Sequence, residues 1–293
     1  MANKVHDDFS REKEAFLEEM AKAEKTGGTK LILVVVANIM DPHIGKGCAK
    51  DIESIRHMFS ALAKHMKFWF LELIIKGESY SIKNVLDSIE SLKPGSDDIV
   101  VFYYSGHGFR FEKDEDEKYP HVYLKATLPV ATGPIINENS QNLNDIFEKV
   151  KARGARLNIV IGDCCNNLIH FKRKFSGGDH KIRTEVQPEW KLDEGMCRTL
   201  FCDVTASILV AAADKGQFSI TDDDLGSIFT FSFTKNLNML MSTPAGSSDG
   251  FAWHKLLEAS QEKTFDLSKT YNIGSDTEEK PGHQKPIFKV FKE

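Results

Sequence analysis

Long hydrophobic runs are missing from this sequence, in which no apolar stretch approaches the roughly 20 residues that span a bilayer. The opening residues, MANKVHDDFSREKEAFLEEM, also lack the apolar segment of a secretion signal. Cysteine is scarce, and five cysteines, an odd number, do not suggest a disulfide framework in a chain of 293 residues. These absences predict a cytoplasmic protein that has no membrane partner.

An excess of positive charge is missing too. The chain has 38 lysines and arginines against 43 acidic residues, for a net charge of −5, which argues against nucleic acid as a partner. It contains no internal repeat and no low-complexity tract. A composition of 41% hydrophobic and 28% charged residues is ordinary for a soluble protein that can bury a sizeable core.

Hydrophobic patterning alternates between strands and helices along the chain. Continuous apolar or β-branched runs, typical of strands that are covered on both faces, occur at 30–38, 68–77, 97–105, 156–163, 206–214 and 285–291. Amphipathic helical spacing occurs at 8–25, 51–66, 81–92, 142–150 and 226–240. This order predicts an α/β fold in which helices cover both faces of a mostly parallel sheet of about six strands, a three-layer α/β/α sandwich.

Two strands end in residues that can carry chemistry. The run VVFYYSGHGF (100–109) presents His107 between two glycines, and the next predicted strand ends in GDCCNN (162–167). Ligands of open α/β sheets bind at the carboxyl ends of the strands, so His107 and the cysteine pair should lie side by side. An imidazole within reach of a thiol can take the thiol proton as the sulfur attacks. Glycine at 108 would let a substrate approach and leave a main-chain N–H for an oxyanion.

Each of these features also has a simpler interpretation. An S-G-H-G sequence alone is usually a glycine turn, and paired cysteines after a strand are often buried small residues. No C-x-x-C pair supplies the spacing of a metal site, so no metal is predicted there. Cys48, Cys197 and Cys202 are expected to be structural. The joint placement of His107 and Cys165 favours catalysis over these alternatives.

The two motifs together resemble those of caspase-like cysteine peptidases, more specifically the metacaspases and their bacterial relatives. The segments GCAKDIESIRHMF (47–59) and VAAADKGQFSITDDDLGSIFTFSF (210–233) resemble two further family segments in the correct order. The spacing of 58 positions between His107 and Cys165 is near the roughly 50 of caspases. The resemblance implies a caspase-like peptidase domain over 30–293, preceded by a helical extension at 1–29.

Roles for individual residues follow from this resemblance. It implies that Cys165 is the nucleophile, that Cys164 occupies a variable small-residue position, and that His107 is the base. Main-chain N–H groups at Gly108 and Cys165 would hold the oxyanion.

Asp51 and Asp163 match positions that line the pocket for a basic substrate side chain in metacaspases. The resemblance therefore implies an endopeptidase that cleaves after arginine or lysine in protein or peptide substrates. Asp51 could instead be only a helix cap. A catalytically silent scaffold that binds a regulatory partner protein is the alternative function.

Two long segments, 110–139 and 166–205, have no predicted element and are expected to be functional or disordered. Metacaspases are commonly activated by calcium, and the acidic run EKDEDE (112–117) invites that interpretation, although a solvated charge run is the commoner explanation. No calcium ligands and no other cofactor are assigned. Basic residues within 171–185 make that stretch a candidate for cleavage by the enzyme itself.

Overall fold

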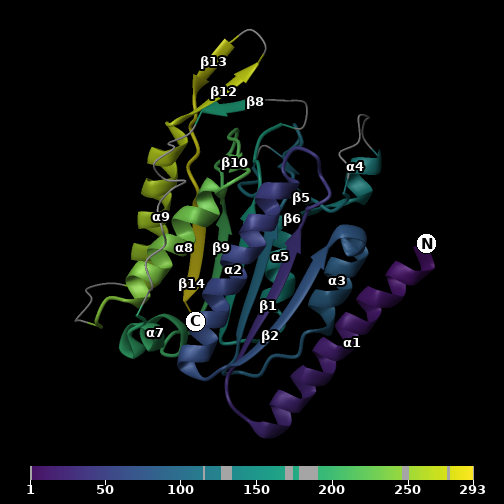
Figure 1. Cartoon of the computed structure of the whole chain (residues 1–293), viewed down its shortest axis with the longest axis vertical. Coiled ribbons are helices and arrows are strands. Elements are labelled where there is room, and N and C mark those ends of the chain that lie inside the picture. The colour runs from purple at the N-terminus through teal and green to yellow at the C-terminus, as the bar shows by residue number, and fades with distance from the viewer. Residues whose placement is uncertain are drawn as a thin grey trace.

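A six-stranded sheet forms the centre of the chain in the computed structural model, which describes residues 2–114, 116–126, 134–168, 174–177, 191–245, 251–275 and 278–292. Its strand order is β14-β9-β7-β3-β1-β2, and every neighbouring pair is parallel except β14 with β9. These strands are β1 (Lys30–Ala37), β2 (Trp69–Lys76), β3 (Ile99–Ser105), β7 (Leu157–Asp163), β9 (Ala206–Ala211) and β14 (Ile287–Lys292). The predicted three-layer α/β/α sandwich with a mostly parallel sheet is confirmed (Figure 1).

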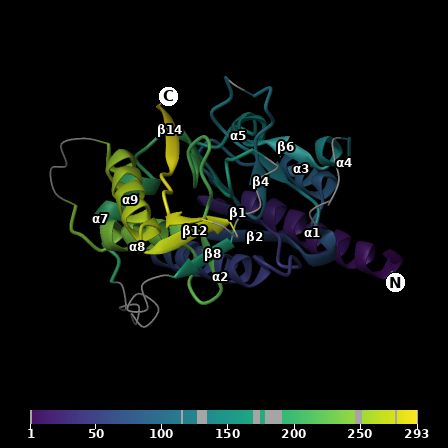
Figure 2. The ribbon, with the colours of Figure 1, turned by 90° about the horizontal axis from the view of Figure 1, so that it is seen from above.

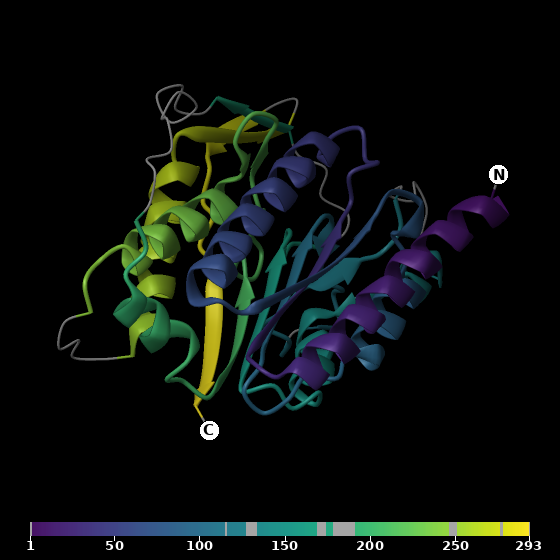
Figure 3. The same ribbon diagram turned by 60° about the horizontal axis from the view of Figure 1, so that its bottom comes forward.

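Helices cover both faces of this sheet. One face carries α2 (Gly45–Met66), α7 (Glu194–Phe201), α8 (Ile228–Met241) and α9 (Ala252–Ser268). The other carries α1 (Ala2–Thr26), α3 (Ile82–Ser91) and α5 (Leu143–Lys151). Figure 3 separates α1, at the N-terminal end, from α2 across the sheet, and Figure 2 shows α7, α8 and α9 gathered at one side of the molecule. A short 3-10 helix, η1 (Gly77–Ser79), precedes α3.

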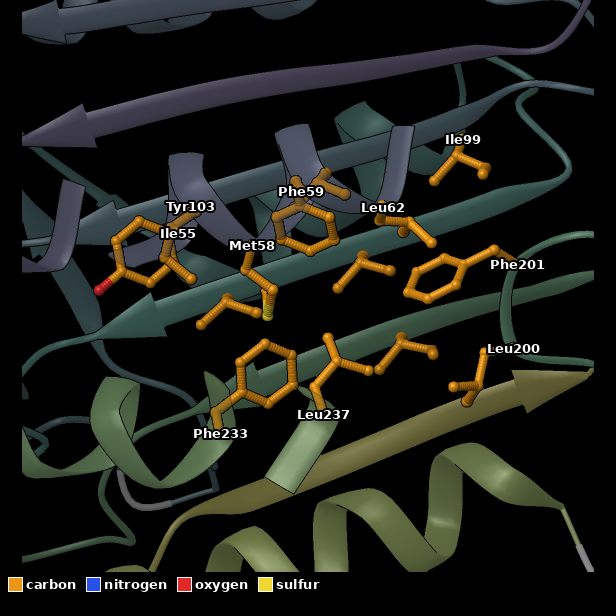
Figure 4. Close-up of a cluster of buried hydrophobic side chains, with 14 of the residues drawn as sticks. Ile55, Met58, Phe59, Leu62, Ile99, Tyr103, Leu200, Phe201, Phe233 and Leu237 are labelled. Atoms are coloured by element: carbon orange, nitrogen blue, oxygen red, sulfur yellow. The ribbon is translucent and has the colours of Figure 1, made fainter. Parts of the chain in front are cut away.

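Alternation of side chains along the strands divides the core into two layers. Leu33 and Val35 of β1 face α2, whereas Ile32 and Val34 face the α1 side, as expected for strands whose residues point alternately to opposite faces. Figure 4 shows the layer under α2, where Phe59 and Leu62 meet side chains of α7, α8 and β3, with the ring of Tyr103 at one end. A strand buried on both faces has to be apolar throughout, which explains the unbroken β1 sequence.

Smaller sheets lie beyond the central one. Figure 1 places β8 (Lys174–Gly177), β12 (Tyr271–Ser275) and β13 (Glu278–Pro281) past the end of the sheet at which β10 (Thr221–Asp222) also lies. β10 pairs with β11 (Gly226–Ser227) in a short hairpin. A third small sheet joins β4 (Gly108–Phe109), β5 (His121–Tyr123) and β6 (Ser140–Asn142), and α4 (Pro134–Glu138) precedes β6.

The predicted elements of the central layers are present, with three differences. α2 begins at Gly45, six positions before the predicted start at Asp51. α7 lies in the segment 166–205, which had no predicted element, and α9 was not predicted. In the described part of the chain no helix is long and apolar enough to cross a membrane.

Candidate active site

The loops that follow β3 and β7 run side by side at the carboxyl edge of the sheet. Ser105 and Asp163 are register partners at the ends of the two strands. The Gly106 N–H donates to the Asp163 carbonyl at 3.3 Å, and further along, the Arg110 N–H donates to the Asn167 carbonyl at 2.8 Å. The main chain thus places the loop that carries His107 against the segment that carries Cys165.

Gly108 lies so close to the cysteine pair that no side chain fits there. A Cβ atom at this position would be 2.4 Å from the Cys164 sulfur and 2.5 Å from the Cys165 carbonyl oxygen. Glycine is required by this close approach. Two positions later the Arg110 N–H donates to the Asn167 carbonyl, so the segment from Gly108 to Arg110 runs along the cysteine segment.

The His107 imidazole is held from the loop after β1. Its Nε2 lies 2.8 Å from Oδ2 of Asp41, whose side chain is 5% exposed, and its own side chain is 19% exposed. The Tyr104 hydroxyl donates to the His107 carbonyl at 2.7 Å and fixes the main chain of the turn. Sequence patterns did not identify Asp41, although it follows the carboxyl end of the first strand, where the same rule of site placement applies.

The two neighbouring cysteines have different surroundings. Cys164 is 1% exposed and packs in the core on the α1 side, and burial raises the pKa of its thiol well above the ordinary value. Cys165 is only partly buried. Its sulfur accepts the Ser219 N–H at 3.4 Å and lies 3.8 Å from the Ser219 carbonyl oxygen. Burial raises the pKa of Cys165 to about 11, against the lowering effect of the Ser219 N–H. Cys165 is therefore the accessible thiol, and it is protonated at neutral pH.

Asp51 and Asp163 lie together in one buried network next to the nucleophile. Asp51 accepts the Ser105 hydroxyl at 2.7 Å and the Ser227 N–H at 2.8 Å. Asp163 accepts the hydroxyls of Ser219 at 2.7 Å and Thr230 at 2.6 Å. Burial and repulsion by Asp163 raise the pKa of Asp51, and burial raises the pKa of Asp163 against its hydrogen bonds.

The helix-cap interpretation of Asp51 is wrong, because this residue lies inside α2 and its carboxylate points to Ser227 rather than to the start of the helix. Ser219, Thr230 and Ser227 could not be assigned to this network from sequence, since each contact joins residues more than 50 positions apart.

One segment packs against Cys165 and the two buried carboxylates. Residues 219–227, here called the closing segment, include β10 and β11, and they contact Cys165 through Ser219 and both carboxylates through Ser219 and Ser227. Gly226 has a φ of +83°, and a Cβ there would lie 2.5 Å from the Asp51 carboxylate. Glycine therefore lets the hairpin sit directly on the buried acid.

The acidic run 112–117 wraps around Arg110. The Arg110 guanidinium donates to the main-chain carbonyls of Asp114, Glu117 and Lys118, and to the Asn166 side chain at 3.1 Å. The Asp114 carboxylate accepts the Phe111 N–H at 2.9 Å and lies 3.1 Å from His121. Asp114 and Glu117 of this run therefore contact protein groups. Across the described ranges no cluster of three or more His, Cys, Asp or Glu side chains is arranged to hold a metal ion.

The other cysteines are either buried in helices or lie at the opposite edge of the sheet from His107. Cys48 is 1% exposed within α2, and Cys197 is fully buried within α7. Cys202 borders a pocket of about 360 Å³ at the opposite edge of the sheet, where Thr29, Asp97 and Arg156 precede β1, β3 and β7. That pocket opens at the amino ends of the strands, so it is not part of the His107 site.

Comparison with known proteins identifies the family of the chain. The sequence matches the caspase domain of peptidase family C14 over residues 30–284. The chain belongs to this family of caspase-like cysteine peptidases.

Two solved structures share the fold. Protein GSU0716 from Geobacter sulfurreducens is 15% identical, with a TM-score of 0.50 over 89% of this chain and 93% of that one. Caspase-1 from Spodoptera frugiperda is 12% identical, with a TM-score of 0.50 over 89% of this chain and 86% of that one. At these identities the likeness concerns the fold alone. Among curated protein sequences, none matches this chain.

Proposed function

We propose that this chain is a cysteine endopeptidase of the metacaspase type that cleaves peptide bonds after arginine or lysine. The observation that carries the proposal is the pair of carboxylates, Asp51 and Asp163, enclosed beside the accessible thiol of Cys165. Among the described residues, the donors that hydrogen-bond to these two carboxylates are hydroxyls and a main-chain N–H, and none is a lysine or arginine side chain. A buried carboxylate pair favours a guanidinium or ammonium group and disfavours an acidic side chain.

In the proposed reaction, His107 takes the proton of the Cys165 thiol as the sulfur attacks the scissile carbonyl carbon. A base is needed because the raised pKa of Cys165 keeps the thiol protonated. The main-chain N–H groups of Gly108 and Cys165 stabilise the oxyanion. His107 then protonates the leaving amine, and water hydrolyses the acyl-enzyme and releases Cys165.

Substrate entry requires the closing segment to move. In the structure the Ser227 N–H and the Ser219 hydroxyl occupy donor positions on the two carboxylates, and Ser219 also contacts the nucleophile. A basic side chain would replace these donors, and the same displacement would release the Cys165 sulfur. Binding of a basic side chain and exposure of the nucleophile are thereby coupled.

Other features of this function stay predictions. We assign residues 1–29 to an extension that precedes the peptidase domain, and we expect a cytoplasmic location, peptide or protein substrates, and neither nucleic-acid nor membrane partners. Regulation by calcium or by a partner protein also stays a prediction. Within the stretch 171–185 that was predicted to be cut, 171–173 and 178–185 lie outside the described residues.

A panel of fluorogenic peptides that differ only at P1 tests the proposal. We expect cleavage after arginine and lysine to exceed cleavage after aspartate or alanine by about ten- to a hundredfold or more, since one charge-assisted hydrogen bond contributes about 1.5–3 kcal/mol. The assay is run with and without calcium. Preference for aspartate would contradict the assigned pocket, and a folded protein that cleaves no peptide would favour the silent scaffold.

A further inference from the structure

The Asp41 carboxylate contacts the imidazole of the proposed base, and no motif of the sequence points to it. Asp41 lies between β1 and α2, and its Oδ2 is 2.8 Å from Nε2 of His107. This contact joins residues 66 positions apart, and both side chains are largely shielded from water. The pair lies at the same sheet edge as Cys165.

The orientation of this carboxylate is fixed by its second oxygen. Oδ1 of Asp41 accepts the main-chain N–H groups of His43 at 2.8 Å and Ile44 at 3.2 Å. Burial alone would raise the pKa of Asp41, but the hydrogen bonds from His107, His43 and Ile44 and the charge of His107 lower it to about 2. Asp41 therefore stays ionised throughout the neutral range, with Oδ2 directed at the imidazole.

An ionised carboxylate only accepts hydrogen bonds, so Nε2 of His107 must carry the proton of this contact. A neutral imidazole has a single N–H, which leaves Nδ1 as the unprotonated nitrogen. We infer that Asp41 is a positioning residue, which holds His107 in the Nε2–H tautomer and stabilises the imidazolium that forms when Nδ1 takes the Cys165 proton. This inference rests on the proposed function, in which His107 is the base.

The charge state of the surroundings supports this role. Other titratable groups around this part of the site are the imidazole of His43, the thiols of Cys48, Cys164 and Cys165, the hydroxyls of Tyr80 and Tyr104, and the carboxyls of Asp51 and Asp163. Burial raises the pKa of each of these thiols, hydroxyls and carboxyls, which favours their neutral forms. The pKa of Asp41, by contrast, is lowered.

The Asp41→Asn variant should reverse the tautomer of His107 and preserve the conformation of the loop between β1 and α2. The two main-chain N–H groups need an oxygen, so the side-chain amide will present its NH₂ group to Nε2, which then has to accept. The proton of neutral His107 should move to Nδ1. Nitrogen-15 NMR of histidine-labelled protein reads the tautomer without any substrate, and His107→Gln identifies the signal among the ten histidines. An unchanged Nε2–H tautomer in Asp41→Asn would overturn the inference.

Kinetics separate positioning from a structural role. We expect kcat of Asp41→Asn to fall by about 10²- to 10⁴-fold with little change in KM, as when a triad carboxylate becomes an amide. The acid limb of the pH profile should move to lower pH, because an NH₂ group facing Nε2 destabilises the imidazolium and His107 acts as a base only in its neutral form. A purely structural role predicts instead that Asp41→Asn resembles wild type and that only Asp41→Ala, which loses the loop contacts, is impaired.

The two experiments also separate this inference from the proposed function. If wild type cleaves no peptide but the tautomer changes in Asp41→Asn, the proposed function fails and the positioning role of Asp41 is retained. If wild type cleaves after arginine and Asp41→Asn matches it in kcat, pH profile and tautomer, the peptidase assignment holds and the role of Asp41 is refuted.

Discussion

Replacement of Cys165 with alanine is expected to abolish peptide hydrolysis, with a loss on the order of 10⁴-fold or more in kcat. Cys165 is the thiol of the pair that is partly accessible at the sheet edge, and its sulfur contacts the closing segment rather than the core. Removal of a nucleophile eliminates the covalent route, whereas the remaining site can only orient water. The measurement is kcat/KM for a peptide with arginine at P1.

Cys164→Ala is the matched control. Cys164 is buried in the core on the α1 side, so its truncation should lower the melting temperature while most of the activity remains. The Cys165→Ala variant should melt near wild type. Equal losses of activity in the two variants, at equal stability, would mean that the nucleophile has been assigned to the wrong cysteine.

Asp163→Asn should weaken cleavage after arginine by about ten- to a hundredfold, because one charged contact to the substrate is lost. The amide can replace the carboxylate in the resting site, since the Ser219 and Thr230 hydroxyls can each donate or accept a hydrogen bond. Asp224→Asn is the control, because it removes the same charge from an exposed position of the closing segment. A similar loss in both variants would indicate a general electrostatic effect.

The stability of Asp163→Asn relative to wild type should increase as the pH rises. The raised pKa of Asp163 means that the folded chain keeps this proton above the ordinary aspartate value near 4, at which the unfolded chain releases it. The unfolded state then binds fewer protons, so wild type loses stability from about pH 4 up to the raised pKa. Asparagine has no proton to lose. A melting-temperature difference that stays constant from pH 4 to 8 would contradict the raised pKa.

Much of the fold was predictable because each central strand is apolar on both faces. That pattern distinguishes β1, β3, β7 and β9 from the surrounding helices, and the rule for parallel sheets then places their carboxyl ends together. α7 was missed because it is only eight residues long and lies in a segment with charged and polar flanks. Its Leu200 and Phe201 belong to the core layer shown in Figure 4.

Sequence motifs predicted the residues of the site that lie within those motifs, but not the contacts that tertiary packing creates. His107 and Cys165 follow the ends of β3 and β7, Asp163 is the last residue of β7, and Asp51 lies within α2. The fold brings the ends of these elements together, so the four residues lie in one region. The closing segment and its contacts to Asp51 and Asp163 depend on tertiary packing, which periodicity does not encode. Asp41 could not be assigned from sequence, because its neighbours in the sequence form an ordinary turn. Its contact with His107 exists only in the folded chain.

Covalent trapping tests the central claim most directly. Wild-type protein is incubated with a peptide acyloxymethyl ketone that has arginine at P1, and in parallel with the aspartate analogue, and the label is located by mass spectrometry of fragments that separate Cys164 from Cys165. The account predicts one label per chain, on Cys165, from the arginine reagent, and much slower labelling by the aspartate reagent. Labelling of Cys164, or faster reaction with the aspartate reagent, would contradict it.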